Sequence, residues 1–159
     1  MRIPIPARYR QLRASAPFET ASVGYHGIRL IPAAELEQAQ QGYGVVGDEE
    51  TDWDPNWLVI GHDEMCGDQI FIDTTDEDVP VYTAEHGTGD WSPRLIAFSF
   101  QHLIDILAQF RSFRGGRASP MELERRPIAG DWARLLSFIR ERNPEIDMSF
   151  WEDWLQDED

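Results

Sequence analysis

The sequence predicts an α+β fold in which neighbouring antiparallel strands are covered by a helix. Three short apolar runs follow one another at residues 57–61 (WLVIG), 69–73 (QIFID) and 79–86 (VPVYTAEH), with turn residues between them. This spacing is typical of adjacent antiparallel strands. Helical periodicity dominates from Phe100 onward. With 159 residues, one domain spanning residues 1–159 is expected.

The N-terminal part is expected to contain two helices with strands between them. Pro6 precedes ARYRQL and Pro32 precedes AAELEQAQQ, and proline is favoured at the start of a helix because its missing N–H has no partner there. Gly42 is expected to end the second helix. Residues 21–31 alternate apolar and polar positions around Gly27 and predict a bent strand or a hairpin. An acidic loop is expected before the strand at residues 57–61.

The C-terminal part reads as a short strand at residues 95–98 followed by several helices. Ser99 can cap the first helix, and further helices are expected to begin near Ser119, at residues 131–142 and after Pro144. Residues at helical spacing predict the apolar faces. These residues are Phe100, Leu103, Ile104, Leu107 and Phe110, then Trp132, Leu135, Leu136 and Ile139, then Ile146, Phe150 and Trp154.

Negative charge is concentrated in the middle of the chain. Residues 30–93 hold 16 of the 29 carboxylates and no arginine, and the chain has no lysine. The middle segment therefore carries −16, whereas 14 arginines and 13 carboxylates leave +1 elsewhere. Such a charge repels nucleic acid and anionic membranes and attracts a basic protein. The alternative for any single carboxylate is a solvated surface that only aids solubility.

Localisation in the cytoplasm is expected. Residues 1–10 (MRIPIPARYR) carry charges and prolines where a signal peptide needs an apolar stretch. The longest apolar run, around residues 95–100, is far shorter than a membrane-spanning helix. Cys66 is the single cysteine, so an internal disulfide is impossible, which fits a reducing compartment.

Two acidic segments are the favoured partner-binding surface. Trp53 stands between carboxylates and is either an exposed anchor or a loop tryptophan that folds back on the core, whereas Trp57 opens an apolar strand and is expected in the core. The predicted partner-binding residues are Asp48, Glu49, Glu50, Asp52, Trp53, Asp54, Asp76, Glu77 and Asp78.

Motifs that suggest a bound cofactor or metal have simpler explanations. Residues 42–47 match GxGxxG, but a predicted helix precedes them and acidic residues follow, which is wrong for a dinucleotide site. His62, Asp63, Glu64 and Cys66 are ligand types, yet the sequence has no second cluster to complete a zinc site. Residues 73–78 lack the EF-hand pattern. We predict no metal and no cofactor.

Catalysis is likewise not favoured. The serines lack a GxSxG elbow, and nothing near Cys66 in the sequence indicates an activating base. His86 and Asp90 could form an acid–base pair, but a glycine turn explains EHGTGDW more simply. With 29 carboxylates, some pair always has a separation suitable for glycoside hydrolysis, so such a pair carries no information. We predict no catalytic residues, and an enzyme remains a third alternative.

Four segments between residues 28 and 110 occur in a familiar order: IRLIPAAEL, WLVIGHDEMCGDQIFIDT, VPVYTAEHGTGDW and LIAFSFQHLIDIL. This order resembles the SMI1/KNR4, or SUKH, superfamily. The resemblance implies an α+β domain with a central, mostly antiparallel sheet, flanking helices and no catalytic activity. The segment SAPFE replaces an asparagine–glycine turn of the relatives, and the helical extension at residues 111–159 lies outside the recognisable core at 28–110.

The resemblance also implies a function. Bacterial relatives are immunity proteins that neutralise toxins, often nucleases, and fungal relatives are regulatory scaffolds. Nucleases tend to be basic because they hold nucleic acid, so an acidic inhibitor would suit such a toxin. We therefore expect a bacterial immunity protein that occludes a basic toxin, with a regulatory scaffold or interaction module as the alternative.

Overall fold

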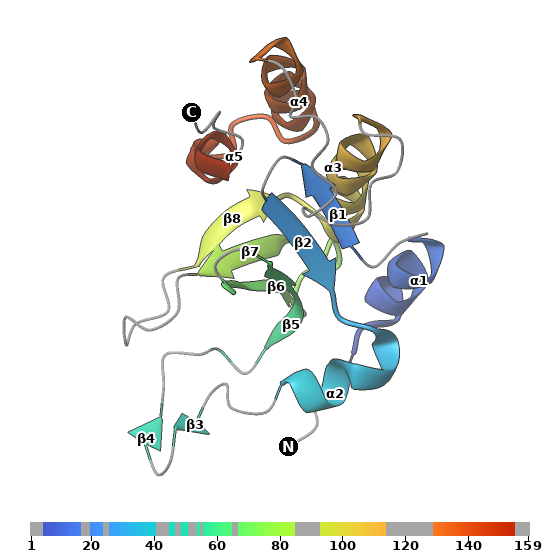
Figure 1. Ribbon diagram of the computed structural model, residues 1–159. Helices are drawn as coiled ribbons and strands as arrows, with labels where there is room; N and C mark the ends of the chain where they lie inside the picture. The colour runs from blue at the N-terminus through green and yellow to red at the C-terminus, as the bar shows by residue number, and fades with distance from the viewer. Residues whose placement is uncertain are drawn as a thin grey trace.

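A six-stranded antiparallel sheet forms the centre of the computed structural model, with strand order β1-β2-β5-β6-β7-β8 (Figure 1). The structure describes residues 5–16, 20–23, 26–40, 45–46, 49–50, 54, 56–64, 67–84, 93–113 and 129–154. The strands are β1 (Thr20–Val23), β2 (His26–Leu30), β5 (Trp57–Asp63), β6 (Gln69–Asp73), β7 (Val81–Ala84) and β8 (Arg94–Ala97). Residues 21–31, predicted as a bent strand or a hairpin, contribute to the antiparallel pair of β1 and β2, so the second alternative holds. The three neighbouring strands β5, β6 and β7 are confirmed.

Helices pack around this sheet (Figure 1). They are α1 (Ala7–Ser15), the 3-10 turn η1 (Ala33–Glu35), α2 (Leu36–Ala39), α3 (Phe100–Phe113), α4 (Ala129–Arg142) and α5 (Ser149–Trp154). The predicted cap of α3 is confirmed, because the Ser99 hydroxyl accepts a hydrogen bond from the His102 backbone N–H at 3.1 Å. The helix expected near Ser119 lies outside the described residues. Within the described ranges, no helix is both long and apolar enough to span a bilayer.

Helix α3 lies at the centre of the packing. It contacts β1 and β8, which are opposite edges of the sheet, so the sheet curls around the helix. Phe100, Leu103 and Leu107 of the predicted face are completely buried. The Phe100 ring lies 4.8 Å from that of Tyr9 in α1, which fixes α1 against α3. One hydrophobic cluster extends from Tyr9 to Trp151.

Two sequence-based expectations need correction. The helix predicted after Pro32 is a 3-10 turn followed by one turn of α-helix, and it ends at Ala39 instead of Gly42. The predicted acidic loop contains a short antiparallel hairpin, in which β3 (Val45–Val46) pairs with β4 (Glu49–Glu50).

The C-terminal helices hold the outer edge of β8. The Trp151 indole N–H donates to the Ile96 carbonyl at 2.9 Å, and the Phe98 backbone N–H donates to the Asn143 side-chain oxygen at 2.9 Å. Both side chains are completely buried. The predicted apolar face includes Phe150 and Trp154 but not Trp151. Phe150 is half-buried, and the Trp154 side chain is not among the described side chains. The Trp151 and Asn143 side chains thus hydrogen bond to backbone groups at the edge of the sheet that could otherwise pair with another strand.

Candidate functional site

Three predicted binding residues lie together in the turn between β6 and β7. Asp76, Glu77 and Asp78 are all exposed there. We call residues 73–79 the acidic turn. The prediction that carboxylates gather at hairpin ends is confirmed for this segment.

The acidic turn is held by its own hydrogen bonds. One carboxylate oxygen of Asp73 accepts from the backbone N–H of Thr75 at 2.9 Å and from its hydroxyl at 2.6 Å. A carboxylate oxygen of Asp76 accepts from the Asp78 N–H at 2.9 Å. These contacts are Asx turns, which fix the backbone locally. The Glu77 and Asp78 side chains are left pointing to solvent from a defined loop.

Val79 ends the acidic turn in a strained conformation. Its φ angle is 45°, in the left-handed region that a β-branched residue rarely adopts. The side chain is 1% exposed, so burial of the isopropyl group holds the residue in place.

A groove lies between the acidic turn and the start of α1. It has a volume of about 540 Å³ and is lined by Pro6, Arg8 and residues 74–79. Its charged lining consists of three carboxylates and one guanidinium. We call it the acidic groove. Sequence analysis missed Pro6, Arg8 and the two threonines, because only tertiary folding brings α1 next to this turn.

Described arginines do not neutralise the acidic turn by ion pairs. The ion pairs seen among described residues join Arg140 to Glu152 at 3.6 Å and Arg142 to Asp105 at 3.2 Å, both among the helices. No described cation lies within ion-pair distance of Asp76, Glu77 or Asp78. The charge has a local effect, because burial first and then the carboxylates of Asp73 and Asp76 raise the pKa of the nearby Tyr82 hydroxyl.

The other predicted contact segment is described only in part. Glu49 and Glu50 form β4, but their side chains lie outside the description. Asp54 is half-buried, and its carboxylate accepts from the Asn56 N–H at 2.8 Å, which starts the turn into β5. Asp48, Asp52 and Trp53 fall outside the described residues. This segment therefore remains a prediction.

The residues weighed for metal binding and catalysis are only partly described. Among described residues, no group of three or more potential ligands lies close enough to hold a metal ion. His62, Asp63 and Glu64 follow one another at the end of β5. Cys66, His86 and Asp90 are outside the described residues, and so are Gly42 and Gly44 of the GxGxxG match. The absence of a metal and of catalytic residues remains an expectation.

Aromatic side chains form a row across the middle of the sheet. The Phe71 ring lies 5.0 Å from Trp57 and 5.9 Å from Tyr82. Phe71 is buried, whereas Trp57 and Tyr82 are half-buried and pack against the core. Trp57, the first residue of β5, therefore packs against the core but is not completely buried.

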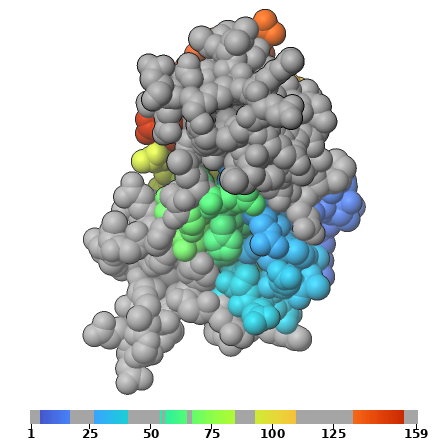
Figure 2. Space-filling model, in the orientation of Figure 1, coloured from blue at the N-terminus to red at the C-terminus, as the bar shows by residue number. Residues whose placement is uncertain are grey.

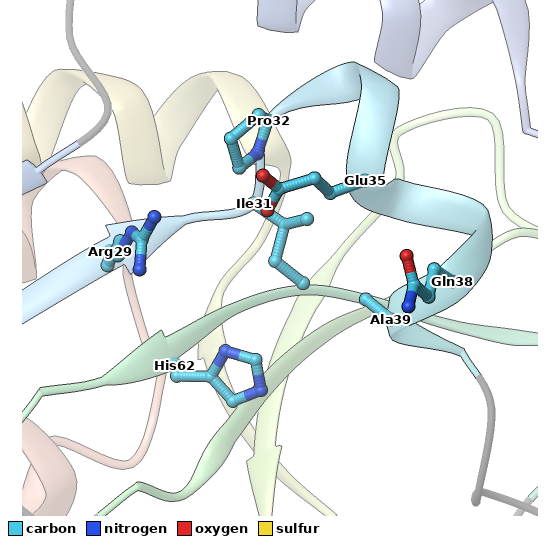
Figure 3. Close-up of a pocket in the computed structure, with 7 residues that line it drawn as sticks. All are labelled: Arg29, Ile31, Pro32, Glu35, Gln38, Ala39 and His62. Carbon is cyan, nitrogen blue, oxygen red and sulfur yellow. The ribbon is translucent and has the colours of Figure 1, made fainter.

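A second groove separates β2 and β5 from the first turns of η1 and α2 (Figure 3). Its volume is about 390 Å³, and it is lined by Arg29, Ile31, Pro32, Glu35, Gln38, Ala39 and His62. Figure 3 shows Glu35 and Gln38 on the helical side, His62 on the strand side and Ile31 between them. We call it the Arg29 groove. Sequence analysis considered His62 only as a metal ligand and did not mark Arg29.

Comparison with known proteins gives a family. The model of the SMI1 / KNR4 family (SUKH-1) matches residues 1–106. This range runs from the N-terminal helix into α3 and contains every strand of the sheet. No curated protein and no solved structure matches the chain.

Proposed function

The chain belongs to the SMI1/KNR4 family (SUKH-1), and from this premise we propose that it is a non-enzymatic binding protein of the immunity type. It neutralises a basic protein toxin, such as a nuclease, by covering the toxin with an acidic surface. It acts in the cytoplasm, where a bacterial nuclease toxin would meet its substrate.

The acidic turn carries the proposal. Asp76, Glu77 and Asp78 are exposed, adjacent in the chain and without an ion pair to any described residue. Charges arranged this way speed the encounter with an oppositely charged surface and fix its orientation. A nuclease presents arginines and lysines around its nucleic-acid site, which is the surface an inhibitor has to cover.

The rigidity of the acidic turn favours binding. Hydrogen bonds from Thr75 and Asp78 fix the loop backbone before any partner arrives. A preorganised loop loses less conformational entropy on association than a mobile one. The adjoining groove of about 540 Å³ gives a long cationic side chain of the partner a recess beside the carboxylates.

Removal of two charges tests the proposal. The Glu77→Gln/Asp78→Asn variant keeps the Asp73 and Asp76 hydrogen bonds that hold the turn, and lowers only its charge. The chain would be co-expressed with the protein encoded beside its gene, scoring rescue of growth and co-purification. Association rates would then be measured at low and high salt. We expect the variant to associate about tenfold more slowly at low salt and with a weaker salt dependence.

Glu141→Gln/Glu145→Gln is the matched control. It removes two exposed carboxylates at the end of α4 and beyond it, away from the acidic turn. The proposal requires this control to associate at nearly the native rate. Equal slowing by both variants would show a general charge effect without a defined surface. An association rate that is insensitive to salt and to both variants would overturn the acidic mode of binding.

A further inference from the structure

The Arg29 groove combines a cation, a neutral ring and an apolar wall. Arg29 and His62 are direct cross-strand partners in the pairing of β2 with β5, so their side chains emerge on the same face. Ile31, Pro32 and Ala39 supply the apolar surface. On the face shown in Figure 2, residues of β2 and α2 (light blue to cyan) adjoin residues of the central strands (green).

The polar groups of this groove are available to a ligand. Arg29 is exposed and forms no ion pair with a described residue, and no described residue hydrogen bonds to the His62 ring. Burial, and then the charge of Arg29, lower the pKa of His62, so the imidazole is neutral at pH 7 and offers one N–H donor. Glu35 does not contribute to this shift. Figure 3 draws the Glu35 side chain on the helical side of the groove and the His62 ring on the strand side.

Charge and shape together indicate the ligand. We propose that the Arg29 groove binds the C-terminal residue of a peptide segment of the protein partner, with the terminal carboxylate on Arg29 and His62 and an apolar side chain against Ile31, Pro32 and Ala39. The proposal rests on the proposed function, since it adds a second chemical feature to the same partner.

A chain terminus fits better than other carboxylates for three reasons. A guanidinium with an adjacent N–H donor matches the two oxygens of a carboxylate. The apolar wall lies directly beside this pair, as the side chain of a terminal residue lies beside its carboxylate. On the opposite side, the Glu35 carboxylate can accept a hydrogen bond from the N–H of the preceding peptide group. The Gln38 amide can donate to the carbonyl of that group or accept from its N–H. The volume of about 390 Å³ suits one or two residues.

Titration of the isolated protein with defined peptides tests the proposal. The probe is acetylated alanyl-alanyl-leucine with a free carboxylate, followed by nuclear magnetic resonance of the His62 ring and the Ile31 and Ala39 amides. We expect saturable shifts at these residues. The C-terminally amidated peptide should bind about tenfold more weakly or not at all, because it lacks the charge that pairs with Arg29.

Variants separate a groove effect from a general charge effect. Arg29→Gln should weaken binding of the peptide with the free carboxylate about tenfold. Arg10→Gln removes an exposed arginine of α1 outside the groove and should not change binding. Glu77→Gln/Asp78→Asn should bind the peptide like the native protein. Failure of this titration therefore leaves the acidic-turn proposal standing. A normal peptide titration together with failure of the toxin-binding assay would instead count against the acidic turn.

Two further probes distinguish the source of the carboxylate. The free acid 4-methylpentanoate carries the same chemistry without a peptide group, and an acetylated alanyl-glutamyl-alanine amide carries an acidic side chain without a free terminus. We expect both to bind more weakly than the tripeptide. Equal or tighter binding of either probe would overturn the assignment to a chain terminus. Equal binding of the amidated peptide, or no shifts at His62, would overturn the site itself.

Discussion

The side-chain amide of Gln40 hydrogen bonds to both backbone groups of Val59. Its Nε2 donates to the Val59 carbonyl at 2.8 Å, and the Val59 N–H donates to its Oε1 at 2.8 Å. The pairing of β2 with β5 ends at Leu30 and Gly61, followed by one hydrogen bond from the Ile31 N–H to the Ile60 carbonyl. Strand β2 therefore does not extend beside Val59. Gln40 replaces a residue of the missing strand, and it also ties the end of α2 to the sheet.

Gln40→Ala should therefore destabilise the fold. Val59 is completely buried, so loss of the amide leaves an N–H and a carbonyl without partners. We expect a decrease of about 2 kcal/mol in the free energy of unfolding, measured by urea denaturation. Gln38→Ala, an exposed change in the same helix, should cost less than about 0.5 kcal/mol. Equal effects of the two substitutions would contradict the role of the amide pair.

The attachment of the C-terminal helices to β8 gives a second prediction. Trp151→Phe keeps most of the ring but removes the N–H that pairs with Ile96, and Asn143→Ala removes the acceptor of the Phe98 N–H. We expect each to lower the free energy of unfolding by about 1–3 kcal/mol, because buried backbone groups lose their partners. Glu141→Ala, an exposed change near the end of α4, is the control.

These substitutions also bear on domain organisation. We propose that residues 1–159 form one domain although the family match ends at residue 106. On this proposal, both variants shift a single unfolding transition that includes the sheet. A separate early transition for α4 and α5, with the transition of the sheet unchanged, would instead indicate an independent C-terminal unit.

The sequence predicts the sheet well where burial alone decides the structure. Residues 69–73 form β6 as expected, because its three successive apolar residues, Ile70, Phe71 and Ile72, are buried on both faces. Helical spacing fails for α5, where Trp151 is buried and Phe150 only half-buried. The choice depends on the Ile96 carbonyl, which lies 55 residues earlier in the chain. Local periodicity contains no information about such a partner.

The candidate sites show the same limit. The acidic turn could be located from its composition, since carboxylates and threonines favour turns. The two grooves could not, because each joins segments distant in the sequence: Arg8 with residues 74–79, and Arg29 with His62. A weak signal did exist for the second groove. Arg29 and His62 directly follow the buried residues Ile28 and Gly61. Because successive side chains in a strand point to opposite faces, Arg29 and His62 are expected on the face opposite to those residues.

Gly61 tolerates no larger residue. A Cβ atom at this position would lie 2.6 Å from the carbonyl oxygen of Arg29, a backbone atom held in the pairing of β2 with β5. We expect Gly61→Ala to lower the free energy of unfolding by more than about 2 kcal/mol. Gly67→Ala, in a turn with φ of 78°, should cost about 1–2 kcal/mol through backbone strain alone. A neutral Gly61→Ala would show that the strands can separate at this point.

His62 should make stability depend on pH. Its pKa is lowered from 6.5 in the folded protein, first by burial and then by Arg29, so the unfolded chain binds the proton more readily. The stability associated with the neutral ring is complete above about pH 6.5 and is lost as the pH falls below that value.

The comparison with His62→Gln isolates this effect from the titration of the many carboxylates. We expect the native protein to lose stability relative to this variant between about pH 7.5 and about pH 5, measured by urea denaturation at each pH. A constant difference between the two proteins, or a change of the opposite sign, would show that the folded protein does not disfavour the charged ring.

Tyr82 reports whether the acidic turn keeps its charge. After burial, the carboxylates of Asp73 and Asp76 raise the pKa of its hydroxyl above the ordinary value of 10.0. Asp76→Asn retains an oxygen for the Asp78 N–H and removes the charge, so the Tyr82 pKa should move back toward that value. Glu77 is not among the causes of the shift, and Glu77→Gln should change the pKa less.

The measurement is phenolate absorbance against pH, with the titration of a Tyr82→Phe protein subtracted to isolate one ring. If a cation such as Arg8 compensated the turn in solution, the field at Tyr82 would already be weak, and Asp76→Asn would leave the pKa unchanged. Added salt should reduce the difference between the native protein and the variant, because exposed charges are screened. A shift on Asp76→Asn that diminishes with salt means that the acidic turn presents uncompensated negative charge, which the proposed capture of a basic toxin requires.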